Sequence, residues 1–245
     1  MLCLKRYWRR WLIAISGAIL LGILFVPAVF QVRTVASLSR RLNCMHLVLS
    51  ELRDYDQMHG RLPAVCEKNA ACDCTLSWRV ALLFYAGGHP LPSRPSPENP
   101  WDSDQNLKYL RMSVLQFCEE PSTDTVMLAV TGKGTAFDMA ASQRLSDLDA
   151  NTIVIIENRR AGVHWLAPIE FDVEPLLGNA GDEKWSRLMA EYGELGFRVG
   201  FADGAVGRLS PSVPLNSIKD FFLVEGARGL DRDRELKQFG FHILQ

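Results

Sequence analysis

The stretch that decides the fold is FRVGFADGAVGRL, residues 197–209. In its first half, large apolar side chains occupy every second position, which predicts a strand with one buried face. The pair Asp203-Gly204 comes next, and it is a preferred sequence for a two-residue turn with positive φ at both central residues. Residues 205–209 then return as a second strand. We therefore expect an antiparallel hairpin with Asp203 and Gly204 at its tip.

Other expected elements lie on both sides of this hairpin. Apolar β-rich runs predict strands, capped helical patterns predict helices, and five closely spaced prolines predict an extended connector. In chain order, these are a helix from residue 75 or 77 to 85, the connector over 90–100, strands over 125–131 and 152–156, and a last helix over 215–224.

The beginning of the chain predicts a membrane segment. Residues 1–10 carry four basic side chains and no acid, and residues 11–32 carry no charge. A helix over 11–32 would be about 33 Å long, enough to cross a hydrocarbon core of about 30 Å. We expect a cytoplasmic tail over 1–10 and a single-pass transmembrane helix over 11–32, retained as a signal anchor in the inner (cytoplasmic) membrane. The alternative is an export signal that is cleaved near Val26-Pro27-Ala28. The rest of the chain would then be periplasmic.

The same helix is expected to continue as an amphipathic segment over residues 33–62. Its apolar residues follow alternating spacings of three and four, which places them on one stripe. The stripe consists of Val35, Leu38, Leu42, Met45, Leu49 and Leu52. It is either a coiled-coil seam or a face that docks on the chain's own sheet, and the small number of heptads favours docking. The prediction is an α+β fold in which a long N-terminal helix, half transmembrane and half amphipathic, packs on an antiparallel β-sheet. Residues 63–245 would form the exported domain.

Composition excludes one class of partner. The 245 residues include 27 Lys and Arg against 28 Asp and Glu, so the net charge is −1. Proteins that bind nucleic acids usually neutralise phosphates with a strongly basic surface. We therefore expect membrane and protein partners and no nucleic acid.

Four cysteines lie in the expected exported domain, where disulfides persist. They are Cys66, Cys72, Cys74 and Cys118. Four cysteines permit three pairings, and a bridge between Cys72 and Cys74 would be strained. We expect Cys66 to pair with one of these two and Cys118 with the other. Free thiols and a zinc site are the alternatives, although the spacing is not that of a zinc ribbon.

Motifs that would carry catalysis or bind a cofactor are incomplete. Asp102, Asp104 and Asn106 imitate the start of a calcium loop, but that loop needs Gly and Glu at later positions that hold other residues here. Residues 132–135, Gly-Lys-Gly-Thr, lack the earlier glycine and the residue order of a phosphate loop. The sequence contains no H-E-x-x-H or G-x-S-x-G motif. We expect no enzymatic activity, no cofactor and no metal.

Seven groups of short motifs occur in a characteristic order. They are Arg41-Leu42-Asn43-Cys44 with Leu47, Tyr55 and residues 59–63; residues 77–83; residues 100–103 with Asn106-Leu107; residues 134–137; residues 151–153 with Glu157; Trp165 with Pro168; and residues 201–206. With this set, the chain resembles the large pilin-like family of unknown function that is abundant in planctomycete bacteria. That family is related to type IV pilins and pseudopilins, whose plan is a long N-terminal helix followed by a sheet.

Two positions depart from the pattern of these relatives. Pilin precursors carry a glycine before a Phe-Thr-Leu-x-Glu start, and residues 10–36 contain no such motif. Many family members also have a His ten residues before the Asp-Gly turn, where this chain has Gly193. The resemblance therefore does not extend to peptidase processing or to filament assembly.

The resemblance implies a membrane-anchored, pseudopilin-like structural or assembly module that acts through protein–protein contacts. Its partners would belong to pilin- or secretion-type machinery. The alternative hypothesis is a cell-surface domain that binds a ligand through aromatic loops around Trp101 and Trp165, with Trp78 as a third candidate ring. Core packing is the commoner role of such rings.

Overall fold

The computed structural model describes residues 36, 37, 39–86, 91, 93–118, 122–141, 143–192 and 196–244. The chain divides into two units, Met1–Asn43 and Cys44–Gln245. In the first unit, the described residues are helical. The elements below belong to the second unit.

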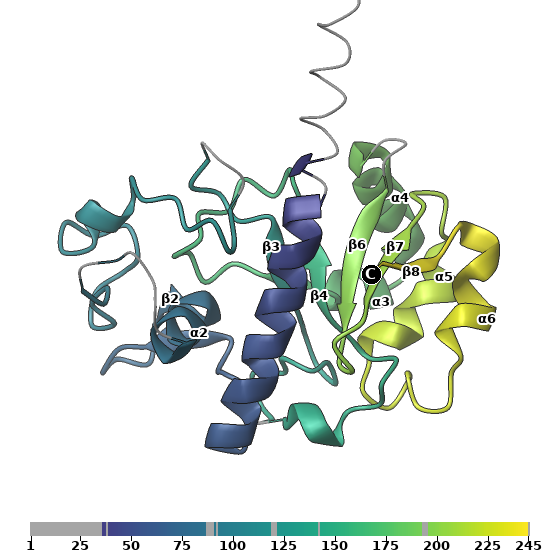
Figure 1. Cartoon of the computed structure of the whole chain (residues 1–245), viewed down its shortest axis with the longest axis horizontal. Coiled ribbons are helices and arrows are strands. Elements are labelled where there is room, and N and C mark those ends of the chain that lie inside the picture. The colour runs from purple at the N-terminus through teal and green to yellow at the C-terminus, as the bar shows by residue number, and fades with distance from the viewer. Residues whose placement is uncertain are drawn as a thin grey trace, which may run out of the picture. The chain divides into compact units, whose positions relative to one another are not determined.

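The second unit starts with a helix over residues 44–59 and continues through short strands and helices (Figure 1). The strands are β1 (Cys66–Lys68), β2 (Cys74–Ser77), β3 (Met127–Thr131), β4 (Ile153–Glu157), β5 (Phe171–Asp172), β6 (Phe197–Phe201), β7 (Val206–Leu209) and β8 (His242–Leu244). The α-helices are α2 (Trp78–Ala86), α3 (Glu174–Leu177), α4 (Gly181–Tyr192), α5 (Leu215–Ile218) and α6 (Arg232–Leu236). The 3-10 turns are η1 (Leu107–Tyr109), η2 (Leu145–Asp147), η4 (Lys219–Phe222) and η5 (Lys237–Phe239).

Six strands form one sheet in the order β5-β3-β4-β6-β7-β8, and β1 pairs with β2 in a separate antiparallel sheet. The α+β class is as predicted, but the antiparallel sheet is wrong because β5 runs parallel to β3, with Val130 opposite Phe171. The connection from β4 to β5 is long enough to carry the chain back to the far edge of β3 in this direction. The sheet is therefore mixed.

The hairpin of β6 and β7 lies at the predicted residues, with Phe197 opposite Leu209. Its loop holds three residues, since Phe201 N donates to Ala205 O. Within this loop only Gly204 has positive φ, at 89°. The sequence rule for a two-residue turn with two left-handed residues therefore does not describe this connection.

Strand β6 is buried on both faces, whereas the sequence predicted one buried face. Phe197, Val199 and Phe201 belong to the core shared with α4, α5 and η4. On the opposite face, Gly200 lies under Leu49 of the 44–59 helix, which crosses the sheet in Figure 1. Arg198 is buried on this strand because it pairs with Glu157 of β4.

The predicted membrane-spanning helix is corrected. Among the described residues, no helix is long and apolar enough to cross a bilayer. The predicted tail over 1–10 and span over 11–32 lie outside the described residues. The described chain therefore contains no long helix that is half transmembrane, and nothing in it supports a single-pass membrane partner or an inner-membrane location. The 44–59 helix carries exposed charged residues such as Arg53 and Asp54, so this helix does not itself span a membrane.

The predicted packing stripe is only partly within the described chain. Val35 and Leu38 lie outside the described residues, and Leu42 of the first unit is partly buried. Met45, Leu49 and Leu52 are buried in the core of the second unit. These three residues dock on the chain's own fold, where they are not available as a coiled-coil seam.

Candidate functional site

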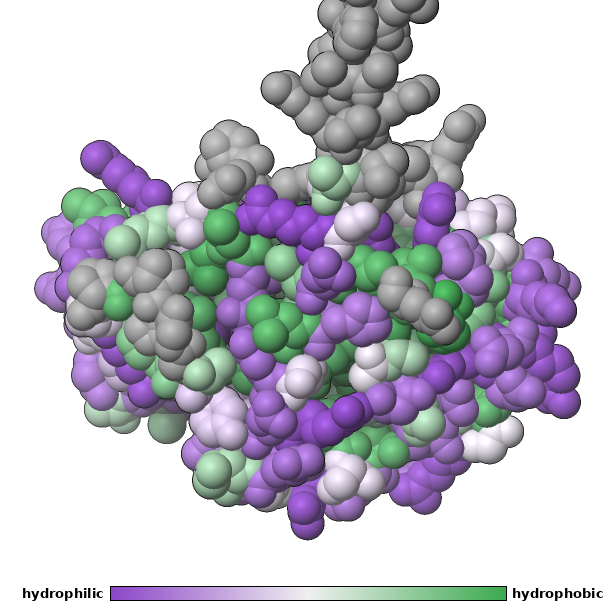
Figure 2. Space-filling view, in the orientation of Figure 1, coloured by the Kyte–Doolittle hydropathy of each residue, from purple (hydrophilic) through white to green (hydrophobic). Residues whose placement is uncertain are grey.

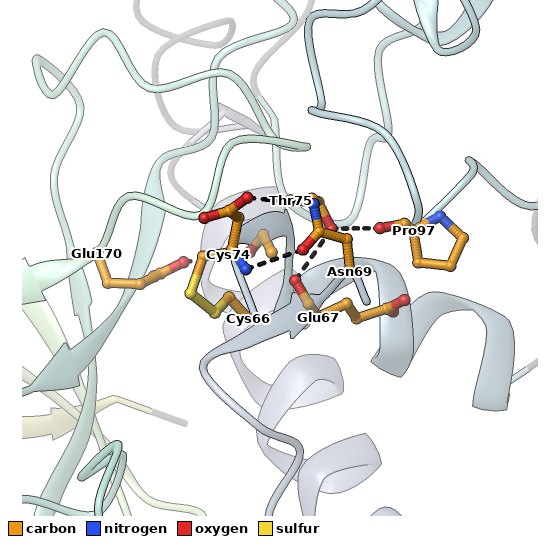
Figure 3. The surroundings of a disulfide bond; sticks show 9 residues. Cys66, Glu67, Asn69, Cys74, Thr75, Pro97 and Glu170 are labelled. Atoms are coloured by element: carbon orange, nitrogen blue, oxygen red, sulfur yellow. Dashed lines mark hydrogen bonds between the residues drawn. A yellow bond between two sulfur atoms is a disulfide. The ribbon is translucent and has the colours of Figure 1, made fainter. Parts of the chain in front are cut away.

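The disulfide joins Cys66 of β1 to Cys74 of β2, with 5.5 Å between their Cα atoms (Figure 3). Between them, residues 69–73 form a tight turn in which the Asn69 side chain accepts hydrogen bonds from the backbone N–H groups of Ala71 and Asp73. The Thr75 hydroxyl donates to the carbonyl groups of Glu67 and Pro97. The strand pair is thus fixed both within itself and to the proline-rich connector.

The other two cysteines of the predicted set are free thiols. Cys72 is exposed at the turn and has a φ of 69°, and Cys118 is buried. The Cys118 thiol donates to Thr123 O, and burial raises its pKa to about 11. The disulfide prediction is confirmed for Cys66 with one of its neighbours, and the expected second bridge to Cys118 is absent.

A groove of about 720 Å³ lies beside this strand pair. One wall is the segment 61–68, which runs into β1, and the other is the segment 136–141. Tyr55, Ala81, Arg94 and Gln143 complete the lining. Its volume lies in the range of known ligand and peptide sites.

Two acidic groups of the groove already have partners. Glu67 forms an ion pair with Arg94 at 2.5 Å. Asp138 accepts hydrogen bonds from the backbone N–H groups of Gly134 and Ala140, and these bonds lower the pKa of its carboxyl. Arg61 and Lys68 are exposed, and in the described part of the chain no carboxylate lies within ion-pair distance of either. The groove therefore presents two cations that the fold does not use.

The buried charges elsewhere serve the fold. Arg79 is fully buried and donates to Glu170 as well as to the carbonyl groups of Met127, Trp165 and Ala167. Glu170 also accepts from the backbone N–H of Ala129. Desolvation raises the pKa of Glu170, while the adjacent Arg79 guanidinium opposes that shift. This pair ties α2 to β3 and to the loop that precedes β5.

A second buried ion pair, between Arg198 and Glu157, joins β6 to β4. Arg198 binds both carboxylate oxygens of Glu157, at 2.9 and 3.1 Å. The Tyr192 hydroxyl donates to Glu157 O at 2.6 Å, and burial raises the pKa of this phenol. Each of these groups is enclosed and bonded to its neighbours, so none is available to a substrate in this conformation.

The predicted turn residues bind side chains from two distant elements. Arg53 of the 44–59 helix donates to Asp203 O, and Arg232 of α6 pairs with the Asp203 carboxylate at 2.6 Å. A Cβ atom at Gly204 would lie 2.7 Å from the Arg53 guanidinium. The Asp203–Gly204 turn therefore anchors both helices to the hairpin.

The aromatic loops do not form an open ligand surface. Trp78 and Trp165 are fully buried, and the Trp165 indole N–H donates to Met112 O. Trp101 stacks on His164, with 5.3 Å between ring centroids. Burial lowers the pKa of His164, whose ring also bonds to Leu110 O. These rings hold loops together in this conformation.

The calcium-like and phosphate-loop-like motifs have structural partners. Asn106 is buried, and its amide bonds to backbone groups of Ser96, Asn99 and Pro100. The Lys133 N–H donates to the Glu174 carboxylate, which would repel a phosphate at that turn. Within the described ranges, no three His, Cys, Asp or Glu side chains gather into a metal-binding cluster.

Exposed large apolar side chains in the described chain include Leu47, Met58 and Ile169. Figure 2 shows small hydrophobic groups separated by hydrophilic ones on the face that carries the 44–59 helix. Met139, on the wall of the groove, is 63% exposed. No family model, curated protein or solved structure matches this chain. The groove is therefore a candidate functional site that rests on geometry alone, and no sequence motif predicts it.

Proposed function

We propose that this chain is a non-catalytic structural or assembly module that binds another protein through the groove between residues 61–68 and 136–141. The single observation that carries the proposal is the unpaired edge of β1. In the described chain, β1 pairs only with β2, and all three of its residues line the groove. An open strand edge is a common docking element for an extended segment of a partner.

The non-catalytic part of the proposal is supported by the use of the buried charges. The two buried ion pairs are Arg79 with Glu170 and Arg198 with Glu157. Their charged groups bond to each other and to backbone groups, and they do not line an open cavity of the described chain. Catalytic acids and bases are usually poised in a cleft with perturbed pKa values. Of the two acidic groups that line the groove, Glu67 pairs with Arg94, and Asp138 has a lowered pKa and accepts hydrogen bonds from its own loop.

The assembly role is supported by the ordered motifs shared with pilin-like proteins. Several of these motifs occupy structural positions here. The 201–206 segment contains the loop that Arg53 and Arg232 bind, and residues 77–83 join the end of β2 to the start of α2 and carry the buried Arg79. Pilin-like proteins act through contacts with other proteins. The proposal requires no membrane segment.

Site-specific photo-crosslinking in the native cells tests this function. A benzophenone amino acid replaces Met139 in the groove wall, or Leu177 of α3, which is also exposed and does not line the groove. We expect a defined protein adduct from position 139 and none from position 177. The adduct should disappear when Ala140→Trp fills the groove and persist with Ala180→Trp, which changes an exposed alanine elsewhere. Equal adducts from both positions, or an adduct that Ala140→Trp leaves unchanged, would contradict the proposal.

A further inference from the structure

We infer that the partner segment is an extended peptide that carries acidic side chains near both ends and pairs through its backbone with the free edge of β1. This inference rests on the proposed function and names the chemistry of its partner. It follows from the register of β1, from the rigidity of that strand and from the charges of the groove.

The register shows which backbone groups of β1 are free. Cys66 lies opposite Ser77, and Trp78 N donates to Val65 O at 3.1 Å. In an antiparallel pair, residues that exchange hydrogen bonds alternate with residues that do not. Because Val65 and Trp78 form a bonded pair, the N–H and C=O of Cys66 point away from β2. Cys66 lines the groove, and no other described segment donates to or accepts from these two backbone groups.

The strand edge is held in place before any partner arrives. The Cys66–Cys74 disulfide fixes β1 to β2, and Thr75 links both strands to the connector through Pro97 (Figure 3). A preformed edge loses little conformational entropy on binding, which favours recognition by strand addition.

The charges of the groove select an anionic segment. Arg61 and Lys68 stand at the two ends of the wall, and both lack an ion-pair partner in the described chain, while Arg94 is occupied by Glu67. The two cations are seven residues apart, at most about 23 Å along an extended strand. A segment with carboxylates at a similar separation can reach both at once.

The floor between these cations suits a backbone with small or apolar side chains. The wall that faces them contains the buried Ala136 and Phe137 and the exposed Ala140 and Ala141. Short side chains let a peptide backbone approach the edge of β1 closely. The groove therefore offers cations that can bind acidic side chains at its ends and apolar contact in the middle.

Fluorescence anisotropy with labelled peptides and the full chain tests the inference. The probe peptide carries Asp near both ends with Val and Thr between. The matched peptides replace both Asp by Asn or by Lys, or carry N-methyl groups on the backbone N–H groups that would face β1. We expect the acidic peptide to bind, the Asn peptide to bind more weakly, and the Lys and N-methyl peptides to lose binding.

Charge reversal in the protein gives the reciprocal test. Arg61→Glu and Lys68→Glu alter exposed side chains and should each weaken the acidic peptide about threefold. Each variant should bind better when the facing Asp of the peptide becomes Lys. Lys184→Glu on α4, which lies outside the groove, should change neither result.

Several outcomes overturn the inference. No binding by the acidic peptide, equal binding by the Asp and Asn peptides, or no effect of the N-methyl groups would each do so. If the crosslink from residue 139 persists while the acidic peptide fails, only the inferred partner chemistry is wrong. If the crosslink also fails, the proposed function is wrong with it.

Discussion

Leu49 lies directly against Gly200: a Cβ atom at residue 200 would lie 3.0 Å from both Cδ atoms of Leu49. The absence of a side chain on β6 lets the 44–59 helix approach the sheet at this point. Both Leu49 and the β6 backbone are therefore buried, and the sheet is covered on a second face. This contact, rather than a coiled-coil seam, explains the apolar residues of the helix.

Gly200→Val should lower the free energy of unfolding by about 2 kcal/mol, because it overpacks the contact with Leu49. Leu49→Ala alone should cost about 3 kcal/mol through the cavity that it leaves. In a chain that already carries Gly200→Val, Leu49→Ala should cost much less, because the valine fills part of the cavity that Leu49 leaves. Urea denaturation of the four proteins measures the coupling. Simple additivity would contradict the contact.

Arg79→Met should destabilise the chain by about 4 kcal/mol, because it leaves the Glu170 carboxylate buried without its cation. The matched control is Arg187→Met, which breaks the exposed Arg187–Glu183 pair of α4 and should cost less than about 0.5 kcal/mol. Thermal and urea unfolding compare the two variants. Equal, small effects would show that Arg79 and Glu170 do not form the described core pair.

The double change Cys66→Ser and Cys74→Ser should lower the free energy of unfolding by about 2.5 kcal/mol, because the disulfide that it removes closes only a short loop. In the unreduced native chain, alkylation followed by peptide mapping should label Cys72 and leave Cys118 unlabelled. Cys118 is buried and its pKa is raised to about 11, so it has little thiolate at neutral pH. Rapid labelling of Cys118, or labelling of Cys66 without reductant, would contradict the assignment.

The stability of the chain should depend on pH through Glu51. Burial raises the pKa of its carboxyl to about 7, and a hydrogen bond from Gln116 opposes that shift. Between the unfolded pKa of 4.5 and the folded value of about 7, the folded chain binds more protons than the unfolded chain. Stability from this group is complete below pH 4.5 and falls as pH rises through 7, by about 1 kcal/mol after allowance for partial exposure.

Glu51→Gln provides the control for that pH effect. The amide is neutral at every pH and can still accept from Gln116, so the variant should lose the part of the pH slope that Glu51 contributes. Urea denaturation at about pH 5 and about pH 7.5 compares the two proteins. Identical slopes would show that Glu51 does not titrate in this range.

The sequence predicted β3, β4 and the β6–β7 hairpin at close to their observed positions, because their apolar patterns are strong and local. It missed that β6 is buried on both faces, since Gly200 and Arg198 look like solvent-facing residues until Leu49 and Glu157 are placed against them. It also missed α4, although Trp185, Met189 and Tyr192 share its buried face. The two residues of β5 are too few to carry a pattern.

The candidate site was much less predictable. Cysteine spacing indicated a bridge from Cys66, but the choice of Cys74 depends on the turn in which Cys72 takes positive φ. The groove joins the segments 61–68 and 136–141, which are far apart in sequence and contain no motif. Only tertiary packing brings Arg61 and Lys68 into the same groove as Ala140.

Amide hydrogen exchange of the full chain, with and without the acidic peptide, tests the central claim most directly. The register directs the Cys66 N–H away from β2, and no described residue accepts from it, so its exchange should slow markedly when the peptide is bound. Exchange across α4 should not change. Unchanged exchange at Cys66 with the peptide bound would contradict strand addition at β1.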